Sequence, residues 1–146
     1  MTALTTVSRA DGARLSDPTF QAFTLLRVGF TAAPILFGLD KFTEWMVDWS
    51  GYLWSGVASA LPGSADDIML VVGAVEIVAG ILVALRPRIG SYVVAAWLAA
   101  IIVNLLLMGD FYDIALRDVG LLLGALTLAR LAAAFPRVGF LGEPRP

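Results

Sequence analysis

One carboxylate interrupts the most apolar run of this chain. The run IMLVVGAVEIVAGILVAL covers residues 68–85, and Glu76 is its only charged residue. At about 1.5 Å of rise per residue, a helix of this length nearly crosses a hydrocarbon core about 30 Å thick. A charged group at that depth costs a few kcal/mol or more unless it is paired or protonated, so it marks a candidate site. The run therefore predicts a membrane helix with one polar residue near its middle.

Three further stretches are long and apolar enough to cross a membrane, at about residues 19–42, 89–109 and 116–135. The composition agrees, because 59% of the 146 residues are hydrophobic, against about 45–50% apolar residues in soluble domains. We therefore predict an all-α membrane protein with four transmembrane helices in a compact bundle. Its membrane domain covers residues 18–135, between cytoplasmic tails at 1–17 and 136–146.

Local signals set the ends of these helices. Ser16-Asp17-Pro18 predicts a helix start, with a capping side chain followed by proline at the first helical position. Arg86-Pro87-Arg88 predicts a tight turn between the second and third spans. In the long loop before the second span, aromatic residues recur at helical spacing and predict a short amphipathic helix in the membrane interface. That helix would either anchor the loop as part of an aromatic belt or act as a lid over a ligand site.

The basic residues favour one orientation. Eight arginines fall on the side of the two termini, and only Lys41 and Arg117 fall on the other side. Because cytoplasmic flanks retain Lys and Arg, both termini are expected in the cytoplasm. Arg27 and Arg130 are expected to extend toward the cytoplasmic headgroups.

Small and polar residues form one stripe on each of three spans, at alternating steps of three and four residues that place them on one helical face. Such stripes allow helices to approach closely in lipid, so each is expected to face the bundle interior. The stripe of the first span is Arg27, Thr31, Pro34, Gly38 and Lys41; that of the second is Met69, Gly73, Glu76, Gly80 and Ala84; that of the fourth is Arg117, Gly120, Gly124 and Thr127.

Helix depths place several polar side chains in the half of the bundle away from the termini. We predict a polar cluster with Glu76 and Asn104 at its floor and with Lys41, Asp40, Arg117 and Asp118 above them. A pocket or lid beside this cluster would use Gly38, Gly73, Trp45, Trp49, Trp97 and Tyr112. Simpler roles remain open: Glu76 can fix helix register, Asn104 can join helices by hydrogen bonds, and Trp97 can be a packing residue.

The composition also limits the chemistry. The chain has no Cys and no His, so we expect no haem, iron–sulfur or zinc site and no other metal. Its formal net charge of −2 argues against nucleic acid as a partner. Any redox centre would have to belong to a partner or to a diffusible cofactor.

Three segments together resemble the DoxX-like family of small four-helix membrane proteins. They are RVGFTAAPILFGLDKF, GAVEIVAGILVAL with arginines after it, and RDVGLLLGALTLARL, and the resemblance covers roughly residues 25–134. It implies a location in the bacterial plasma membrane, and the family includes a quinone-linked subunit of thiosulfate oxidation and membrane partners of redox enzymes. The positions that match its motifs are Gly38, Lys41, Gly73 and Glu76. Relatives often carry a His near the outer face, which this chain lacks.

Residues and resemblance together favour an accessory or anchoring subunit of a membrane redox system that is not catalytic on its own. Its expected partners are the lipid bilayer and another membrane or redox protein, or a second copy of itself, with a quinone or a lipid as ligand in the outer leaflet. Two alternatives stay open: a catalytic quinone-dependent oxidoreductase subunit, and a small proton-coupled exporter. The exporter is disfavoured because such proteins often insert in both orientations, which needs a weaker charge bias than eight against two.

Overall fold

Four long helices make up most of the structure, a computed structural model that describes residues 16–135. They are α2 (Pro18–Thr43), α4 (Ala65–Leu85), α5 (Pro87–Met108) and α6 (Tyr112–Ala134), and no strand occurs within the described range. The helices α2, α4 and α5 are long and apolar enough to cross a membrane, and many of their large hydrophobic side chains are exposed. The chain is therefore an all-helical membrane protein over this range. Both predicted tails lie outside it, except for Ser16 and Asp17.

The helix starts follow from local capping. Asp17 caps α2 by accepting a hydrogen bond from the Thr19 backbone N–H, and Pro18 takes the first helical position, as predicted. Helix α4 begins at Ala65, three residues before the predicted start, because Ser64 and Asp67 form a reciprocal capping box. These bonds satisfy backbone groups that a helix end otherwise leaves unpaired.

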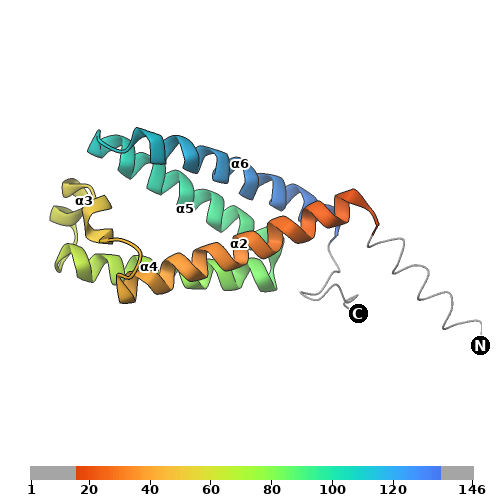
Figure 1. The fold of residues 1–146 in the computed structure, drawn as a ribbon, viewed down its shortest axis with the longest axis horizontal. Coiled ribbons are helices and arrows are strands. Elements are labelled where there is room, and N and C mark those ends of the chain that lie inside the picture. Colours follow the sequence, from red (N-terminus) through yellow and green to blue (C-terminus); the bar gives the residue numbers. More distant parts are fainter. Residues whose placement is uncertain (1–15, 136–146) are drawn as a thin grey trace, which may run out of the picture.

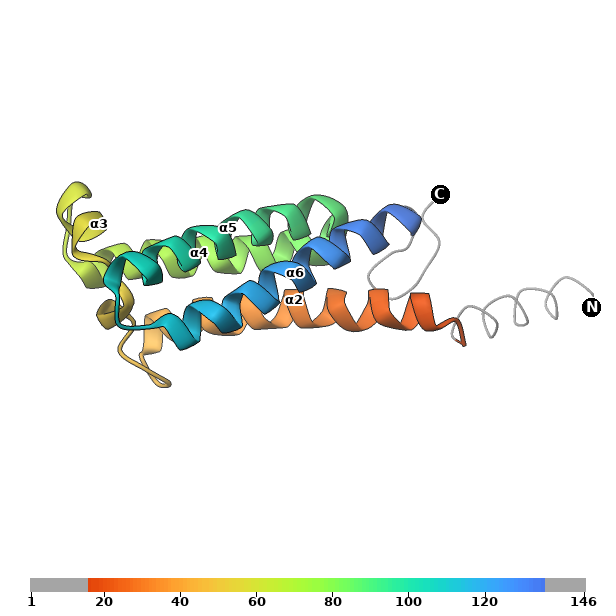
Figure 2. The same ribbon diagram turned by 90° about the horizontal axis from the view of Figure 1, so that it is seen from above.

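The long helices pack as two antiparallel pairs, α2 with α4 and α5 with α6 (Figure 1). At one end, Arg86 alone separates α4 from α5, and α2 begins and α6 ends there; we call this the turn end. At the other end, the loop end, the pairs spread apart, and the 44–64 loop lies there with α3 beside α4 and α5 (Figures 1 and 2). The two helix pairs thus meet at the turn end, and the 44–64 loop lies at the end where they diverge.

The predicted stripes of the first and second spans do face each other. A Cβ atom added at Gly38 would lie 2.6 Å from the Gly73 carbonyl oxygen, and one added at Gly80 would lie 2.8 Å from the Thr31 carbonyl oxygen. Neither distance is sterically acceptable, so the α2 and α4 backbones are in contact because these positions lack side chains. This confirms the interior face predicted for these two helices.

The stripe predicted for the fourth span was only partly right: Gly124 lies against the Phe30 ring of α2, where an added Cβ atom would be 3.1 Å from the ring, but the other three members do not face the interior. A Cβ atom added at Gly120 would have no neighbouring atom within 4 Å, and Arg117 and Thr127 are exposed. The buried face of α6 instead carries alanines together with Asp118 and Leu128: Ala115, Asp118, Ala125, Leu128, Ala129 and Ala132. Alanine allows close packing almost as well as glycine, so small residues lie on both faces of α6 and periodicity alone could not choose between them.

The loop helix also differs from its prediction. Two short helices replace the expected single one, η1 (Trp49–Tyr52) and α3 (Ser55–Ala60), and Trp45 lies in neither. The Asp48 carboxylate caps η1 by accepting bonds from the Ser50 hydroxyl and backbone N–H, and these bonds lower the pKa of that carboxyl below its usual value. Because these contacts start a new helix at Trp49, the aromatic spacing does not continue along one axis.

The apolar core occupies the turn end. Phe20, Phe23 and Phe135 pack their rings together there, against Val83 and Leu128.

Arg27 lies beside this core and is only 3% exposed, with its guanidinium donating to the Ala84 carbonyl oxygen at 2.6 Å. The prediction that Arg27 extends to the headgroups was therefore wrong. The carbonyl groups in the last turn of α4 lack helical partners and attract a cation.

Candidate functional site

A buried ion pair joins α2 to α4. Lys41 Nζ lies 2.7 Å from Glu76 Oε2, and the two residues are 5% and 7% exposed. Glu76 is near the middle of the 21-residue helix α4. Lys41 lies close to the end of α2, and its flexible side chain reaches inward to the carboxylate. The carboxylate at mid-helix is thus paired.

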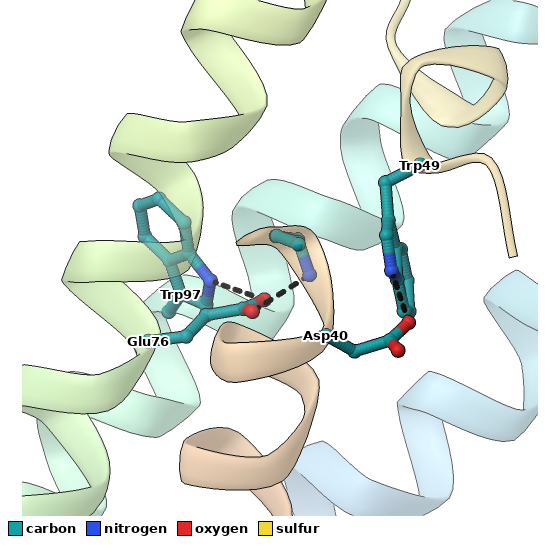
Figure 3. Close-up of polar contacts among 5 residues, drawn as sticks. Asp40, Trp49, Glu76 and Trp97 are labelled. Carbon is teal, nitrogen blue, oxygen red and sulfur yellow. Dashed lines mark hydrogen bonds and ion pairs between the residues drawn. The ribbon is translucent and has the colours of Figure 1, made fainter. Parts of the chain in front are cut away.

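Two tryptophans complete the surroundings of this pair (Figure 3). Trp97 of α5 directs its indole N–H toward Glu76 Oε1, with 3.4 Å between the heavy atoms. On the other side, Lys41 Nζ lies 3.7 Å from the centre of the Trp49 ring, within the range of a cation–π interaction. Trp49 belongs to η1, so the 44–64 loop contributes directly to the ion pair's environment. We call Asp40, Lys41, Trp49, Glu76 and Trp97 the Lys41–Glu76 site.

Asp40 holds the loop against α2. Its carboxylate accepts from the Trp49 indole N–H at 2.7 Å and from the Met46 backbone N–H at 3.0 Å. It is 5% exposed, which is uncommon for an aspartate unless its oxygens are satisfied. These two bonds hold the loop so that the Trp49 ring lies over Lys41. Asp40 therefore affects the Lys41–Glu76 pair indirectly, through the position of the loop.

Asn104 does not share a floor with Glu76. Its side-chain amide donates to the Tyr52 carbonyl oxygen at 2.7 Å and accepts from the Trp54 backbone N–H at 3.0 Å. The amide therefore bonds the loop backbone from the α5 side. The helix pairs spread apart at this end and the loop lies near Asn104, which sequence spacing could not reveal.

The remaining predicted residues lie outside the site. Arg117 and Asp118 approach each other at 3.8 Å, with Asp118 buried and the Arg117 side chain 69% exposed. Over residues 16–135, no hydrogen bond or ion pair connects either of them to Lys41 or Glu76. Trp45 and Tyr112 are also exposed, at 89% and 60%. The structure thus brings together only part of the predicted cluster.

Several contacts at the loop end had no sequence signal. Trp49 packs its ring edge-on against Phe37 of α2, and Tyr52 packs against Phe111, with ring centres 4.8 Å apart. The Asp40–Trp49 bond belongs to the same group. All of them depend on how an irregular loop folds back, and neither periodicity nor depth predicts that.

Close helix packing positions the ion pair. Lys41 follows Gly38 by three residues and Glu76 follows Gly73 by three, so the glycine contact sets both side chains on facing surfaces. Removing one partner of a buried pair leaves an uncompensated charge and typically costs about 3–5 kcal/mol. Neither Lys41 nor Glu76 can therefore remain charged and buried at low cost without the other.

The arrangement offers hydrogen-bond donors beside a carboxylate. No group of three or more His, Cys, Asp or Glu side chains capable of holding a metal occurs in the range 16–135. Lys41 and Trp97 supply hydrogen-bond donors, and Glu76 supplies a carboxylate at the same point. Such a combination can bind a polar ring and exchange a proton with it. Comparisons with protein families, characterised proteins and solved structures found no match for this chain.

Proposed function

We propose that this chain is an accessory subunit of a membrane redox system, related to the DoxX-like proteins, and that the Lys41–Glu76 site receives the ring of a quinone. The single observation that carries the proposal is the buried Lys41–Glu76 pair at 2.7 Å, covered by a tryptophan from a loop. A buried ion pair is a weak source of stability, because hydrophobic replacements are often as stable or more so. Its presence in the middle of an apolar helix is therefore better explained by binding.

The proposal includes four membrane spans, with α6 as the fourth. Helix α6 has 23 residues, long enough to cross, but it carries Asp113, Arg117, Asp118 and Arg130 and is thus more charged than the other three. Asp118 turns inward, while Arg117 is exposed near the loop end, from where its long side chain can reach the headgroups. Both termini lie in the cytoplasm of a bacterium in this scheme, and the loop end faces outward.

Trp49 covers the position that the ligand takes. Its flat ring already lies 3.7 Å from Lys41 Nζ, so a quinone ring of similar size replaces it when the loop moves. A quinone carbonyl then accepts a hydrogen bond from Lys41. Reduction of the ring to a quinol also takes two protons, which come from solvent, and Glu76 relays them to the ring oxygens. Electrons come from a partner subunit, because the chain has no Cys or His to hold a redox metal centre.

Quinone binding to the purified protein tests this function. A short-chain ubiquinone analogue is titrated into the protein in mild detergent, and quenching of tryptophan fluorescence is followed. Saturable quenching is expected, and Lys41→Met should weaken it about tenfold or more because a hydrogen bond from a charged donor is lost. Trp45→Phe is the matched control, since Trp45 lies in the same loop but is exposed.

Non-saturable quenching, or equal affinity in the wild type and Lys41→Met, would overturn the quinone assignment. Quinone reduction by the chain purified alone would overturn the accessory role and favour the catalytic alternative. A pH-driven substrate flux in liposomes that disappears in Glu76→Gln would instead support the exporter.

A further inference from the structure

A shallow apolar groove of about 290 Å³ lies on the side of α4 turned away from α2. Its α4 residues are spaced three to four apart, on the helical face opposite Gly73, Glu76 and Gly80. All the lining residues are aliphatic: Val71, Ala74, Val75, Val78, Ala79 and Leu82 of α4, with Val93 of α5. The groove is separate from the Lys41–Glu76 site, which lies on the α2 side of the same helix.

Exposed positive charge stands at one end of this groove. Arg86 ends α4 as its C-cap, with its backbone N–H donating to the carbonyl oxygen of the lining residue Leu82, and Arg88 comes two residues later; both arginines are exposed. Helix α5 starts between them with no side-chain cap and no acidic residue in its first turn. The apolar groove therefore leads to the two exposed arginines of the α4–α5 turn.

We propose that the groove and the Arg86–Arg88 turn form a binding site for a phospholipid with an anionic headgroup. Val71 and Leu82 are eleven residues apart, about 16 Å along the helix, which matches half of a hydrocarbon core about 30 Å thick. One acyl chain lies along the valines, and the phosphate pairs with the arginines.

Charge complementarity selects the lipid class. The α4–α5 turn carries two arginines, and the residues between Leu82 and Val93 include no acid. Attraction to an anionic surface strengthens binding about fivefold per basic residue. An anionic phospholipid is therefore favoured over a zwitterionic one of the same chain length. This site does not depend on whether the Lys41–Glu76 site binds quinone.

Native mass spectrometry of the delipidated protein tests the site. Phosphatidylglycerol and phosphatidylcholine with identical acyl chains are titrated separately, and the bound fraction gives an apparent dissociation constant. The wild type should prefer phosphatidylglycerol, and Arg86→Gln should weaken that lipid about fivefold. Arg130→Gln is the matched control, because it removes one exposed positive charge at the same end of the bundle but from α6, and it should change binding less than about twofold.

A second variant tests the groove itself. Val78 is 64% exposed, so Val78→Phe fills the groove without disturbing the core and should weaken both lipids, with both arginines in place. Thermal unfolding in detergent checks that each variant is folded. Equal binding of the two lipids, an equal loss in Arg130→Gln, or no effect of Val78→Phe would each overturn the proposal. A lipid-free dimer that Val78→Phe dissociates would overturn it too, and would assign the groove to a second copy.

Discussion

The Lys41–Glu76 pair owes its energetic importance to burial. In water such a pair contributes roughly 0–1 kcal/mol, because solvent screens the charges and two flexible side chains must be ordered. Here both residues are almost fully covered, so neither charge can turn to water when its partner is removed. Each charge also has a tryptophan neighbour that a substitution would affect: Trp97 donates a hydrogen bond to the Glu76 carboxylate, and the Trp49 ring covers the Lys41 ammonium.

Lys41→Met should destabilise the protein by about 3–5 kcal/mol, because it leaves the Glu76 carboxylate buried without a cation. The double variant Lys41→Met/Glu76→Leu should regain most of that loss, since no isolated charge remains. Unfolding in a mixed detergent series, followed by circular dichroism, measures both. Arg117→Met is the control: the Arg117 side chain is 69% exposed, so solvent screens its charge at 3.8 Å from Asp118 and a change of no more than about 1 kcal/mol is expected. A double variant as unstable as the single one would contradict this account.

At the scale of helices, the contact between Gly38 and Gly73 determines how α2 and α4 cross. Each glycine faces the carbonyl oxygen of the other, and an added Cβ would lie closer than 3 Å to it. The next polar pair along these faces is Lys41 and Glu76. Any change that moves the two backbones apart therefore also lengthens the ion pair.

Gly73→Ala should cost about 1–3 kcal/mol, since the added methyl group meets backbone atoms and Lys41 Cβ, and the helices must separate. Gly120→Ala is a matched change on α6, where no atom lies within 4 Å of the new Cβ. It should be neutral or stabilising by up to about 1 kcal/mol, because alanine favours helix more than glycine does. The same unfolding series measures both, and equal effects of the two would argue against the close crossing.

Asn104→Leu should release the 44–64 loop. It removes a donor to the Tyr52 carbonyl and an acceptor for the Trp54 N–H, at a cost of about 1–3 kcal/mol for backbone groups left unsatisfied. Hydrogen–deuterium exchange should accelerate in residues 44–64 but not in α4. Ser59→Ala is the control, since that hydroxyl bonds only within α3. Unchanged loop protection in Asn104→Leu would show that the Asn104 bonds are not needed to hold the loop.

The sequence predicted the helices far better than the loop. Glu76 within its apolar run, and the glycine faces of α2 and α4, follow from periodicity, because helix geometry repeats about every 3.6 residues. The partner of Asn104 and the position of Trp49 do not, since they depend on how an irregular segment folds between distant helices. The interior face of α6 was predicted only in part for a different reason: its alanines and glycines satisfy the same packing rule on neighbouring faces, and of the two predicted glycines only Gly124 lies against α2.

At the scale of the whole molecule, the two ends of the bundle have different characters. The turn end is closed by phenylalanine, valine and leucine side chains, with Arg27 bonded to the end of α4. The loop end contains the Lys41–Glu76 site, and the loop is tied to α2 by Asp40 and to α5 by Asn104. A ligand that enters the site through a movement of the loop therefore comes from the loop end. The orientation of the bundle then decides from which side of the membrane that ligand arrives.

Labelling of single cysteines determines that orientation and tests the fourth span. The chain has no native Cys, so each introduced thiol reports alone. Ser59→Cys and Asp110→Cys place exposed thiols at the loop end, and Arg88→Cys and Ala134→Cys place them at the turn end. In intact bacteria, a membrane-impermeant maleimide should label the first two, and the other two only after lysis. Within residues 16–135, Arg27, Arg86, Arg88 and Arg130 lie in the turn-end half, and only Lys41 and Arg117 lie in the loop-end half. This distribution favours the cytoplasmic side for the turn end. If Ala134→Cys is labelled in intact cells while Arg88→Cys is not, α6 does not cross the membrane.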